Sequence, residues 1–567
     1  MRKSVFIIVF ILFQFSLAFS QSRNEIATPK TLQDSTAKYQ AIIDSCIKAI
    51  SINSNDAASY YILGKVKLDI NNNQEAILDF SKAIEIDYQD KFSKQYSERI
   101  EIDERDERAY FNRGLAKYKL QDMSGAIQDF GNAIKLNEKN DTAYYYMGLA
   151  EYSENFGMQK WATAIADYSA AIKINPKYLD AYFARGQTYF DLENYLSAIS
   201  DFSKTIELDS NNDDAFYSRG LAEYNTNDLK GAINDCSRAI KIDSMDNNAY
   251  IIRGNANYEL NNYTAAKGDY SKSIEISPRD KSAYYNRGLV NFELKNYSDA
   301  IKDYAKSIEI DPYNKKDPNN KDVYYNSGLA NYEGLYFSNA VSDFSKAIEI
   351  EPNEDLYYYR ALANDEIKNY SAAIKDYSKV IELGPKNGDE FYNRGLAKLH
   401  FKDLNGAIED FSKAIEINPK NENAYLERGE ANIALNNFLT TIEDCSKVIK
   451  INPKLGKAYL MMGFAKYSLN NFKGAIKEYT KAISIGQENE IPYLYRGNVK
   501  MKMYNLKGAI RDFSKSIEVN PQYADAYEYR GFAKFNQGNT NEACLDWYKA
   551  KELGSLTIEE TLNKYCH

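Results

Sequence analysis

The sequence predicts an all-α solenoid, a stack of one repeated helix-turn-helix unit. A glycine recurs with a period of 34 residues, an alanine follows it after twelve residues, and an aromatic residue follows that alanine after four. These spacings are helical, because residues four apart lie on one face of an α-helix. The glycine column predicts about fourteen units, with an alanine in the ninth: Gly64, Gly114, Gly148, Gly186, Gly220, Gly254, Gly288, Gly328, Ala361, Gly395, Gly429, Gly463, Gly497 and Gly531.

Each unit is expected to contain two amphipathic helices joined by a short polar turn. Residues 107–120 carry Phe111, Leu115 and Tyr118 at helical spacing, and residues 123–136 form the second helix of that unit. A tyrosine or phenylalanine stands four residues before every position of the glycine column. Because a large ring needs a small neighbour, we expect the small residues to let the two helices approach while these rings and the second-helix aromatics fill the space between them.

The N-terminal residues 1–20 predict a cleavable secretory signal. Arg2 and Lys3 precede an apolar run from Val5 to Phe19, and small residues stand where a signal peptidase cuts. The alternative is an uncleaved membrane anchor, although about 15 apolar residues are short for a bilayer span. We therefore expect a secreted or periplasmic protein with no stable membrane insertion after cleavage.

Two further segments are expected before the repeat array, which spans residues 57–555. Residues 21–36 are polar and predict a flexible N-terminal segment, and residues 37–56 match the second half of a unit and predict a degenerate half repeat. Residues 88–104 add about half a unit within the array, so we expect a loop at its edge.

The C-terminal segment, residues 556–567, predicts a capping helix. Ile558, Leu562 and Tyr565 share one face, and Thr557-Ile-Glu-Glu560 has the pattern of a capping box. Such a helix would close the apolar end of a repeat stack.

Composition argues against an enzyme and against a nucleic-acid binder. Only His400 and His567 are present, and a formal charge of -9 with 71 basic against 80 acidic residues does not suggest a phosphate-binding surface. The sequence has no phosphate loop, no dinucleotide glycine pattern and no cysteine pair at zinc spacing. We expect no catalytic residue, no cofactor and no metal site.

The repeat resembles the tetratricopeptide repeat family, with its 34-residue helix-turn-helix and its aromatic, Gly, Ala, aromatic and Pro columns over residues 57–557. This resemblance implies a right-handed superhelix in which the first helices line a concave groove that binds peptides or partner proteins. A lysine, arginine and asparagine clamp for C-terminal carboxylates is not expected, because no dense basic cluster accompanies the asparagines of this face.

The groove implied by this resemblance contains tyrosines and carboxylates in the middle of the array. Tyrosine supplies contact area at little entropic cost, and carboxylates attract basic partners. The alternative is that the glutamates only solvate an exposed helix face. The candidate binding residues are Tyr217, Tyr285, Tyr325, Tyr358, Tyr392, Glu259, Glu293, Glu333 and Glu366.

Arginine stands directly before the small-residue column in ten units, where the family often has leucine. An aspartate or glutamate stands directly before every second-helix aromatic, so an arginine-carboxylate ladder is one interpretation. For Arg219, the predicted partner is Asp235 or Asp201. The other interpretation is a solvated acidic face with lysine partners, as for Asp79 and Lys82.

The leading functional hypothesis is an exported scaffold that holds a protein or peptide, basic in character, along the groove. The alternative is a glycan or cell-wall binder that stacks sugar rings on the tyrosines. Increasing ionic strength should weaken carboxylate-steered protein binding and leave sugar stacking almost unchanged.

The five cysteines fall into two groups. Cys46, Cys236 and Cys445 occupy the second-helix aromatic column and are expected to be small buried residues. Antiparallel packing of the last second helix against the cap would bring Cys544 beside Cys566, and an oxidising compartment would then allow a disulfide. The alternative is two free thiols.

Overall fold

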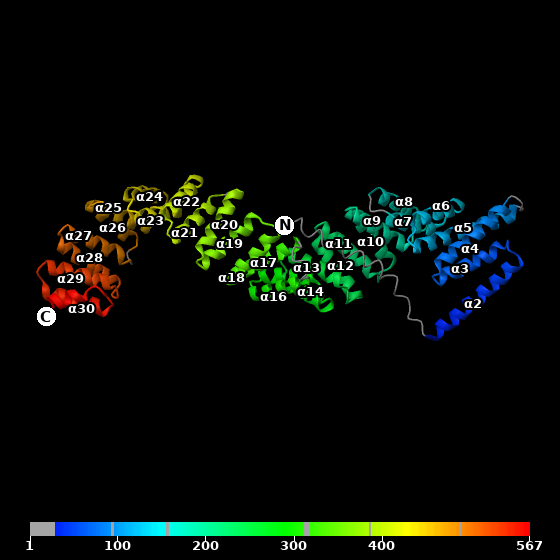
Figure 1. Cartoon of the computed structure of the whole chain (residues 1–567), viewed down its shortest axis with the longest axis horizontal. Helices are drawn as coiled ribbons and strands as arrows, with labels where there is room; N and C mark the ends of the chain where they lie inside the picture. Colours follow the sequence, from blue (N-terminus) through cyan, green and yellow to red (C-terminus); the bar gives the residue numbers. More distant parts are fainter. Residues whose placement is uncertain are drawn as a thin grey trace. The chain divides into compact units, whose positions relative to one another are not determined.

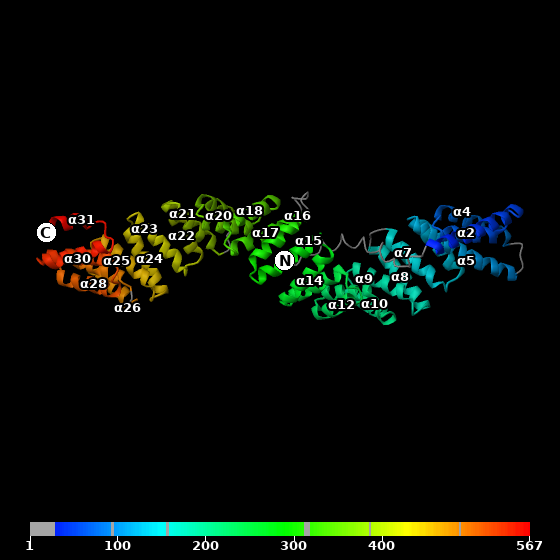
Figure 2. The same cartoon turned by 90° about the horizontal axis from the view of Figure 1, so that it is seen from below.

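The computed structural model describes residues 29–91, 96–154, 158–310, 318–384, 387–486 and 489–566. Throughout these ranges the secondary structure is α-helical and contains no strand, so the predicted all-α fold is confirmed. The chain divides into two compact units, Met1–Asp311 and Pro312–His567. The helices of each unit follow one another as a stack (Figures 1 and 2). The secretory signal expected at residues 1–20 lies outside the described residues.

The N-terminal unit begins with one helix and continues as pairs of a first and a second helix. Its helices are α2 (Pro29–Ile52), α3 (Ala57–Asp69), α4 (Asn73–Asp90), α5 (Tyr96–Lys119), α6 (Met123–Leu136), α7 (Asp141–Glu154), α8 (Met158–Ile174), α9 (Leu179–Asp191), α10 (Tyr195–Leu208), α11 (Asp213–Asn225), α12 (Leu229–Ile242), α13 (Asn247–Glu259), α14 (Tyr263–Ile276), α15 (Lys281–Glu293) and α16 (Tyr297–Ile310).

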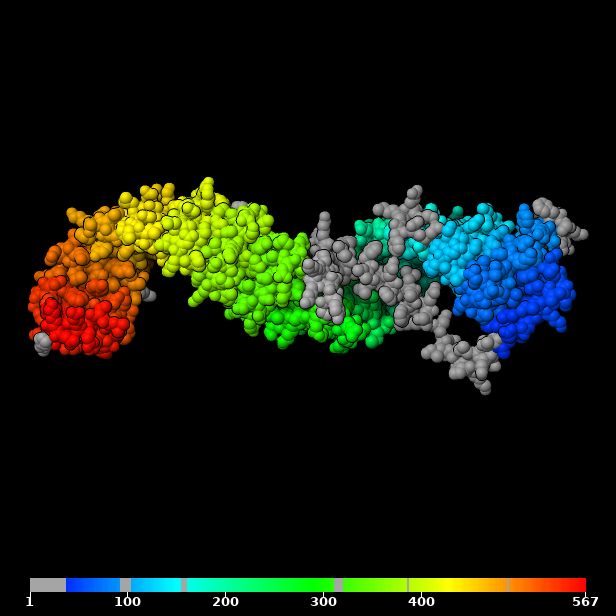
Figure 3. Space-filling model, viewed as in Figure 1, coloured from blue at the N-terminus to red at the C-terminus, as the bar shows by residue number. Residues whose placement is uncertain are grey.

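The C-terminal unit continues with pairs of the same kind and ends in one short helix. Figure 3 shows this unit, green to red, as a closely packed stack that curves toward its red end. Its helices are α17 (Pro318–Glu333), α18 (Phe337–Ile350), α19 (Glu354–Glu366), α20 (Tyr370–Leu383), α21 (Asp389–His400), α22 (Leu404–Ile417), α23 (Glu422–Ala434), α24 (Phe438–Ile451), α25 (Gly456–Ser468), α26 (Phe472–Ile485), α27 (Ile491–Lys502), α28 (Leu506–Val519), α29 (Ala524–Asn536), α30 (Thr540–Glu552) and α31 (Glu559–Tyr565).

The glycine column exists because a second-helix ring lies against it. A Cβ atom added to Gly186 would lie 2.8 Å from the ring of Phe202, and one added to Gly395 would lie 2.7 Å from the ring of Phe411. These phenylalanines are fully buried. We expected the rings four residues before the glycine to fill the same space. They lie instead beside the arginine column; for example, the Arg360 guanidinium lies 5.6 Å from the centroid of the Tyr357 ring.

The turn within each pair needs one residue in the left-handed region. Among the residues that the structure describes, twelve other than glycine have a φ between 57° and 70°, and each stands seven positions after the small-residue column. The second helix then begins with a polar cap in many pairs: the side chains of Asp122, Asp228 and Asp403 accept a hydrogen bond from the backbone N–H three residues later.

At the N-terminal end, helices extend into segments that we expected to lack them. Helix α2 begins at Pro29, so the end of the expected flexible segment 21–36 is helical. In the expected edge loop 88–104, residues 88–90 continue α4 and residues 96–104 belong to α5. The added turns are tied together by ion pairs, because Arg105 donates two hydrogen bonds of 2.6 Å to Asp87.

The C-terminal cap forms, but its predicted capping box does not. Helix α31 begins at Glu559, and the Thr557 hydroxyl donates to the carboxylate of Glu528 on α29 instead of capping the helix. Ile558 and Leu562 are buried against α30. A disulfide joins Cys544 to Cys566, whose Cα atoms lie 5.6 Å apart.

The other three cysteines are buried and free, as expected: Cys46, Cys236 and Cys445. Among the described residues, no helix combines the length and the apolar character needed to span a membrane.

Candidate functional site

The first helices of successive pairs lie next to one another and form a continuous face within each unit. In the N-terminal unit, α9 contacts α11, α11 contacts α13 and α13 contacts α15; in the C-terminal unit, α17 contacts α19 and α21 contacts α23. The candidate tyrosines and glutamates all come from these helices. We refer to this surface as the first-helix face. The structure places Tyr217, Tyr285, Glu259 and Glu293 in one unit and the other five candidates in the other.

The candidate tyrosines are half-buried, because one side of each ring packs inward. The ring of Tyr285 lies 6.0 Å from Tyr304, that of Tyr325 lies 6.2 Å from Phe344, that of Tyr358 lies 6.1 Å from Tyr377, and that of Tyr392 lies 5.9 Å from Phe411. Tyr217 packs beside the buried Cys236. These tyrosines therefore serve the core as well as the face, and burial raises the pKa of Tyr358 and Tyr392.

The candidate glutamates are exposed. Glu259, Glu293 and Glu366 lie near a tyrosine of the preceding first helix, whereas Glu333 lies near Tyr332 of its own helix. Burial and then the charge of Glu259 raise the pKa of Tyr224 to about 12, and burial and then Glu293 raise the pKa of Tyr258 to about 12. The pKa of Tyr332 is also raised, first by burial and then by Glu366 and Glu333. At α11/α13, α13/α15 and α17/α19, a carboxylate of one first helix thus lies near a phenol of the helix before it.

Sequence analysis missed the tyrosine column that makes these contacts. It stands four residues after the glycine, at Tyr118, Tyr152, Tyr224, Tyr258 and Tyr332. At Tyr152, the hydroxyl donates a 2.5 Å hydrogen bond to Asp191 of the next first helix. The repeat period could have revealed this contact, because the acceptor, Asp191, stands five residues after the next glycine, Gly186.

One carboxyl group on this face is unusually easy to protonate. Burial raises the pKa of Asp365 to about 6, although a hydrogen bond of 3.2 Å from the Tyr377 hydroxyl works in the opposite direction. The charge of His400 on the next first helix also lowers the pKa of Asp365, whereas the negative charge of the neighbouring Glu366 raises it. The face in the C-terminal unit therefore loses negative charge below about pH 6.

The arginine column is structural, and the predicted carboxylate ladder is confirmed. All ten arginines reach the aspartate sixteen residues later, with the closest nitrogen and oxygen atoms 2.5 to 2.8 Å apart. Arg219 pairs with Asp235 and not with Asp201. Each arginine also donates to a hydroxyl of the preceding second helix, a third ligand that we did not predict; for Arg360 this is Ser345, at 3.0 Å.

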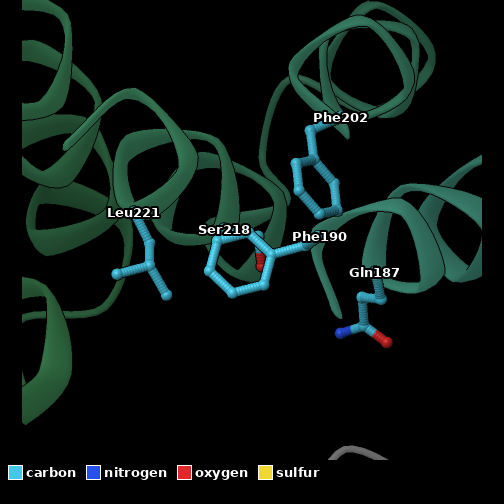
Figure 4. A pocket seen from close by; sticks show the side chains of 5 residues that line it. All are labelled: Gln187, Phe190, Phe202, Ser218 and Leu221. Atoms are coloured by element: carbon cyan, nitrogen blue, oxygen red, sulfur yellow. The ribbon is translucent and has the colours of Figure 1, made fainter. Parts of the chain in front are cut away.

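A shallow pocket opens between α9 and α11 in the N-terminal unit. Its cavity volume is about 10 Å³, roughly the space of one water molecule, and it is lined by Gln187, Phe190, Phe202, Ser218 and Leu221. Figure 4 shows that these side chains come from three helices, with the ring of Phe202 contributed by α10. None of these residues was a candidate from the sequence.

Comparison with known proteins agrees with this architecture. Profiles described as Tetratricopeptide repeat match residues 57–90, 107–140, 183–247, 282–314 and 456–489, and one described as TPR repeat matches residues 156–193, 254–295 and 402–436. Together they cover about half of the chain. The chain belongs to the tetratricopeptide repeat family. The array has the architecture of a protein-interaction scaffold. Scaffold folds of this kind are generally non-catalytic.

Solved structures similar to this tetratricopeptide repeat protein include three that match only part of it. The MamA protein is 25% identical over 32% of this chain and 96% of its own, with a TM-score of 0.28. YrrB, described as a TPR protein with an unusual peptide-binding site, is 24% identical over 33% and 93%, with a TM-score of 0.30. A tetratricopeptide repeat protein from Parabacteroides merdae is 21% identical over 44% and 99%, with a TM-score of 0.35. No curated protein sequence matches the chain.

Proposed function

We propose that the protein is an exported scaffold that binds a basic partner protein, or an extended segment of one, along its first-helix face. The observation that carries this proposal is that exposed carboxylates lie near tyrosines on that face, at Glu259 and Glu293 in one unit and at Glu333 and Glu366 in the other. Carboxylates steer a basic partner, and tyrosines add contact area with little loss of side-chain entropy.

The packing of the tyrosines supports a protein partner over a glycan. A sugar ring stacks on an open aromatic face, whereas each of Tyr285, Tyr325, Tyr358 and Tyr392 has a second-helix ring against one side. What these rings still offer is an edge and a hydroxyl group beside a carboxylate. That combination suits lysine and arginine side chains, which form hydrogen bonds with carboxylates and cation-π contacts with tyrosine.

Export is the part of the proposal that rests on the N-terminal sequence and on the disulfide. Basic residues followed by an apolar run are typical of secretory signals, and the Cys544–Cys566 bond suits an oxidising compartment. Mass spectrometry of the protein from the exported fraction should find a mature chain that begins at Gln21. A chain that stays inside the cell and retains residues 1–20 would contradict export.

Capture experiments with charge-reversed variants test the binding face. The immobilised wild-type protein should retain a basic partner from the exported fraction at low salt and release it as the salt concentration rises. The double variants Glu259→Lys/Glu293→Lys and Glu333→Lys/Glu366→Lys should retain less of it. The matched control is Glu409→Lys/Glu443→Lys, because these exposed glutamates lie on the second helices α22 and α24. Equal retention by all variants would contradict the proposal.

A further inference from the structure

The C-terminal unit contains a local excess of positive charge. Residues 445–517 hold fourteen lysines and arginines against four acidic residues, in a chain whose 80 acidic residues outnumber its 71 basic ones. The charge of the whole chain, from which we expected no phosphate-binding surface, conceals this excess. Because the excess is local, it marks one surface and is not a general property of the chain.

Three columns of the second helix carry much of this charge, ten, fourteen and eighteen residues after the small-residue column. Since these columns are four residues apart, their side chains follow one stripe along the helix. All three are basic in only two of the fourteen units, at Lys473, Lys477 and Lys481 in α26 and at Lys507, Arg511 and Lys515 in α28. All six side chains are exposed. We refer to these six residues as the basic stripe.

One arginine holds the two halves of the basic stripe together. Arg496 of α27 donates a hydrogen bond of 2.9 Å to Thr480 of α26 and bonds of 2.9 and 2.8 Å to Asp512 of α28. Thr480 directly precedes Lys481, and Asp512 directly follows Arg511. Figures 1 and 2 show α26 and α28 side by side. The six cations therefore form one continuous surface.

Little negative charge compensates the basic stripe. Among the described residues, no carboxylate forms an ion pair with five of its side chains: Lys473, Lys477, Lys481, Lys507 and Arg511. In nine units a glutamate stands three residues after the last of the three columns, as Glu518 does after Lys515, but Ser484 takes that place after Lys481. The other carboxylates of these helices, Glu478 and Asp512, are buried and bind cations of the first helices. The stripe is therefore available to an external anion.

Apolar side chains are exposed at one end of the basic stripe. In the turn before α28, Met503 is 40% exposed and Tyr504 is 89% exposed, and Lys507 follows three residues later. The φ of Tyr504 is 57°, at a turn position where asparagine stands in five units, and its ring and hydroxyl have no partner among the described residues. An unfavourable backbone that buries no ring indicates that the ring has a role outside the chain.

We propose that the basic stripe and the Tyr504 turn bind the surface of a membrane that contains anionic phospholipids. The cations lie against the lipid phosphates, and the Met503 and Tyr504 side chains enter the boundary between headgroups and acyl chains. This proposal goes beyond the scaffold function, because it gives the second helices a task of their own. They attach the scaffold to a membrane while the first-helix face stays open to its partner.

The arrangement of the exposed side chains favours a membrane over a nucleic acid. Single-stranded nucleic acids bind where aromatic rings and cations follow one groove, so that successive bases can stack. Here the exposed ring of Tyr504 stands beyond the end of the basic stripe, and no ring lies between the cations of α28 on the exposed side. Lipid headgroups move laterally to meet cations, so a stripe without a pocket is sufficient to bind them.

Co-sedimentation of the full-length protein with lipid vesicles tests the basic stripe. The protein should bind phosphatidylcholine vesicles that contain about one third phosphatidylglycerol at least about tenfold more tightly than phosphatidylcholine alone. Lys473→Gln/Lys477→Gln/Lys481→Gln should bind the anionic vesicles at least about tenfold more weakly than wild type. The matched control, Lys375→Gln/Lys379→Gln/Lys413→Gln, removes as many charges from exposed positions of α20 and α22 and should bind as wild type.

A fluorescent ring at the Tyr504 turn gives a readout that charge alone would not change. In Tyr504→Trp, the emission should shift to shorter wavelength when anionic vesicles are added, because the ring leaves water for the interface. Wild type is the control, since its own tryptophans, Trp161 and Trp547, lie in α8 and α30 and should not respond. Tyr504→Gly should bind the anionic vesicles about threefold more weakly than wild type.

The outcomes separate a membrane from other occupants of the surface. Equal binding of anionic vesicles by the two triple variants, or an unshifted emission of Tyr504→Trp, would overturn the proposal. An oligomer that only the Lys473, Lys477 and Lys481 substitutions dissociate, with vesicle binding unchanged, would also overturn it, because the stripe would then bind a second copy of the chain. All variants keep the same N-terminus, so the apolar residues 1–20 cannot cause a difference between them.

Discussion

One arginine side chain in this solenoid joins three helices. In the α19/α20 pair, Arg360 donates hydrogen bonds of 2.8 and 2.7 Å to Asp376 of α20 and one of 3.0 Å to Ser345 of α18, while its guanidinium lies over the Tyr357 ring. Asp376 is almost fully buried. Removal of the arginine would therefore leave a buried carboxylate without its cation.

Arg360→Leu should lower the free energy of unfolding by about 2 kcal/mol, although leucine is common at this position in the family. The double variant Arg360→Leu/Asp376→Leu should recover at least half of that loss, because both charges are then gone. Urea unfolding measures both, with Lys379→Ala as the control for an exposed ion pair, expected to change stability by less than about 0.5 kcal/mol. A loss equal to the control would contradict the structural role of the arginine column.

A strained turn offers a change in the opposite direction. Tyr504 has a φ of 57° and is 89% exposed. The left-handed backbone is unfavourable for a tyrosine, and burial of the ring does not offset this strain. Gly538 occupies the same position in the last pair. We expect Tyr504→Gly to raise the free energy of unfolding by about 0.5 kcal/mol, as measured by urea unfolding. Gly538→Tyr should do the reverse, and a destabilised Tyr504→Gly would show that the exposed ring contributes more than the strain costs.

At the scale of elements, the α7/α8 pair is one of four pairs without the arginine, and Met147 stands in its place. Its aspartate, Asp167, faces Glu151 instead, and burial followed by the charge of Glu151 raises the pKa of Asp167 to about 8. The folded state therefore holds a proton that the unfolded chain releases near pH 4. The contribution of Asp167 to stability is therefore greatest below about pH 4 and is lost as the pH rises from about 4 to about 8.

The protonation of Asp167 should be visible as local opening of this pair. Hydrogen exchange in α8, corrected for the intrinsic rate, should become faster between about pH 5 and pH 8, by at least about 1 kcal/mol of local stability. Asp167→Asn should remove most of this dependence. Helix α10 is the internal control, because its Asp201 is held by Arg185. Equal pH dependence of α8 and α10 would contradict the assignment.

The C-terminal cap is the element that depends most on a covalent link. Helix α31 has seven residues, and Leu562 is its one fully buried side chain, so the disulfide to α30 should stabilise its docking by about 3 kcal/mol in the loop-entropy estimate. In Cys544→Ser/Cys566→Ser, amides of α31 should exchange near the unfolded rate while α27 and α28 keep their protection. Retained protection of α31 would show that Ile558 and Leu562 hold the cap alone.

The sequence predicted the regular elements well and the irregular ones poorly, for identifiable reasons. The expected helix 123–136 matches α6, because the Asp122 cap and the Ala126 and Phe130 columns mark its position and its buried face. Helix α5 begins at Tyr96, well before the expected residue 107, because ion pairs between Arg105 and Asp87 extend the helix beyond the repeat. No period in the sequence aligns those charges.

At the scale of the whole molecule, the candidate site likewise contains features that the sequence predicts and features that it does not. The exposure of Glu259 and its neighbours in the column could be predicted from their place in the period. The burial of one side of Tyr325 could not, because it depends on Phe344 sixteen residues after the glycine.

The scaffold function depends on charge complementarity along the first-helix face, so the salt dependence of association with the captured partner tests it most directly. The association rate constant of the wild-type protein should fall steeply as ionic strength rises. Glu259→Lys/Glu293→Lys should associate more slowly and with a much flatter salt dependence, while Glu409→Lys/Glu443→Lys, which carries the same change in net charge on the second helices, should behave as wild type. Identical salt dependence for the two double variants would contradict the account.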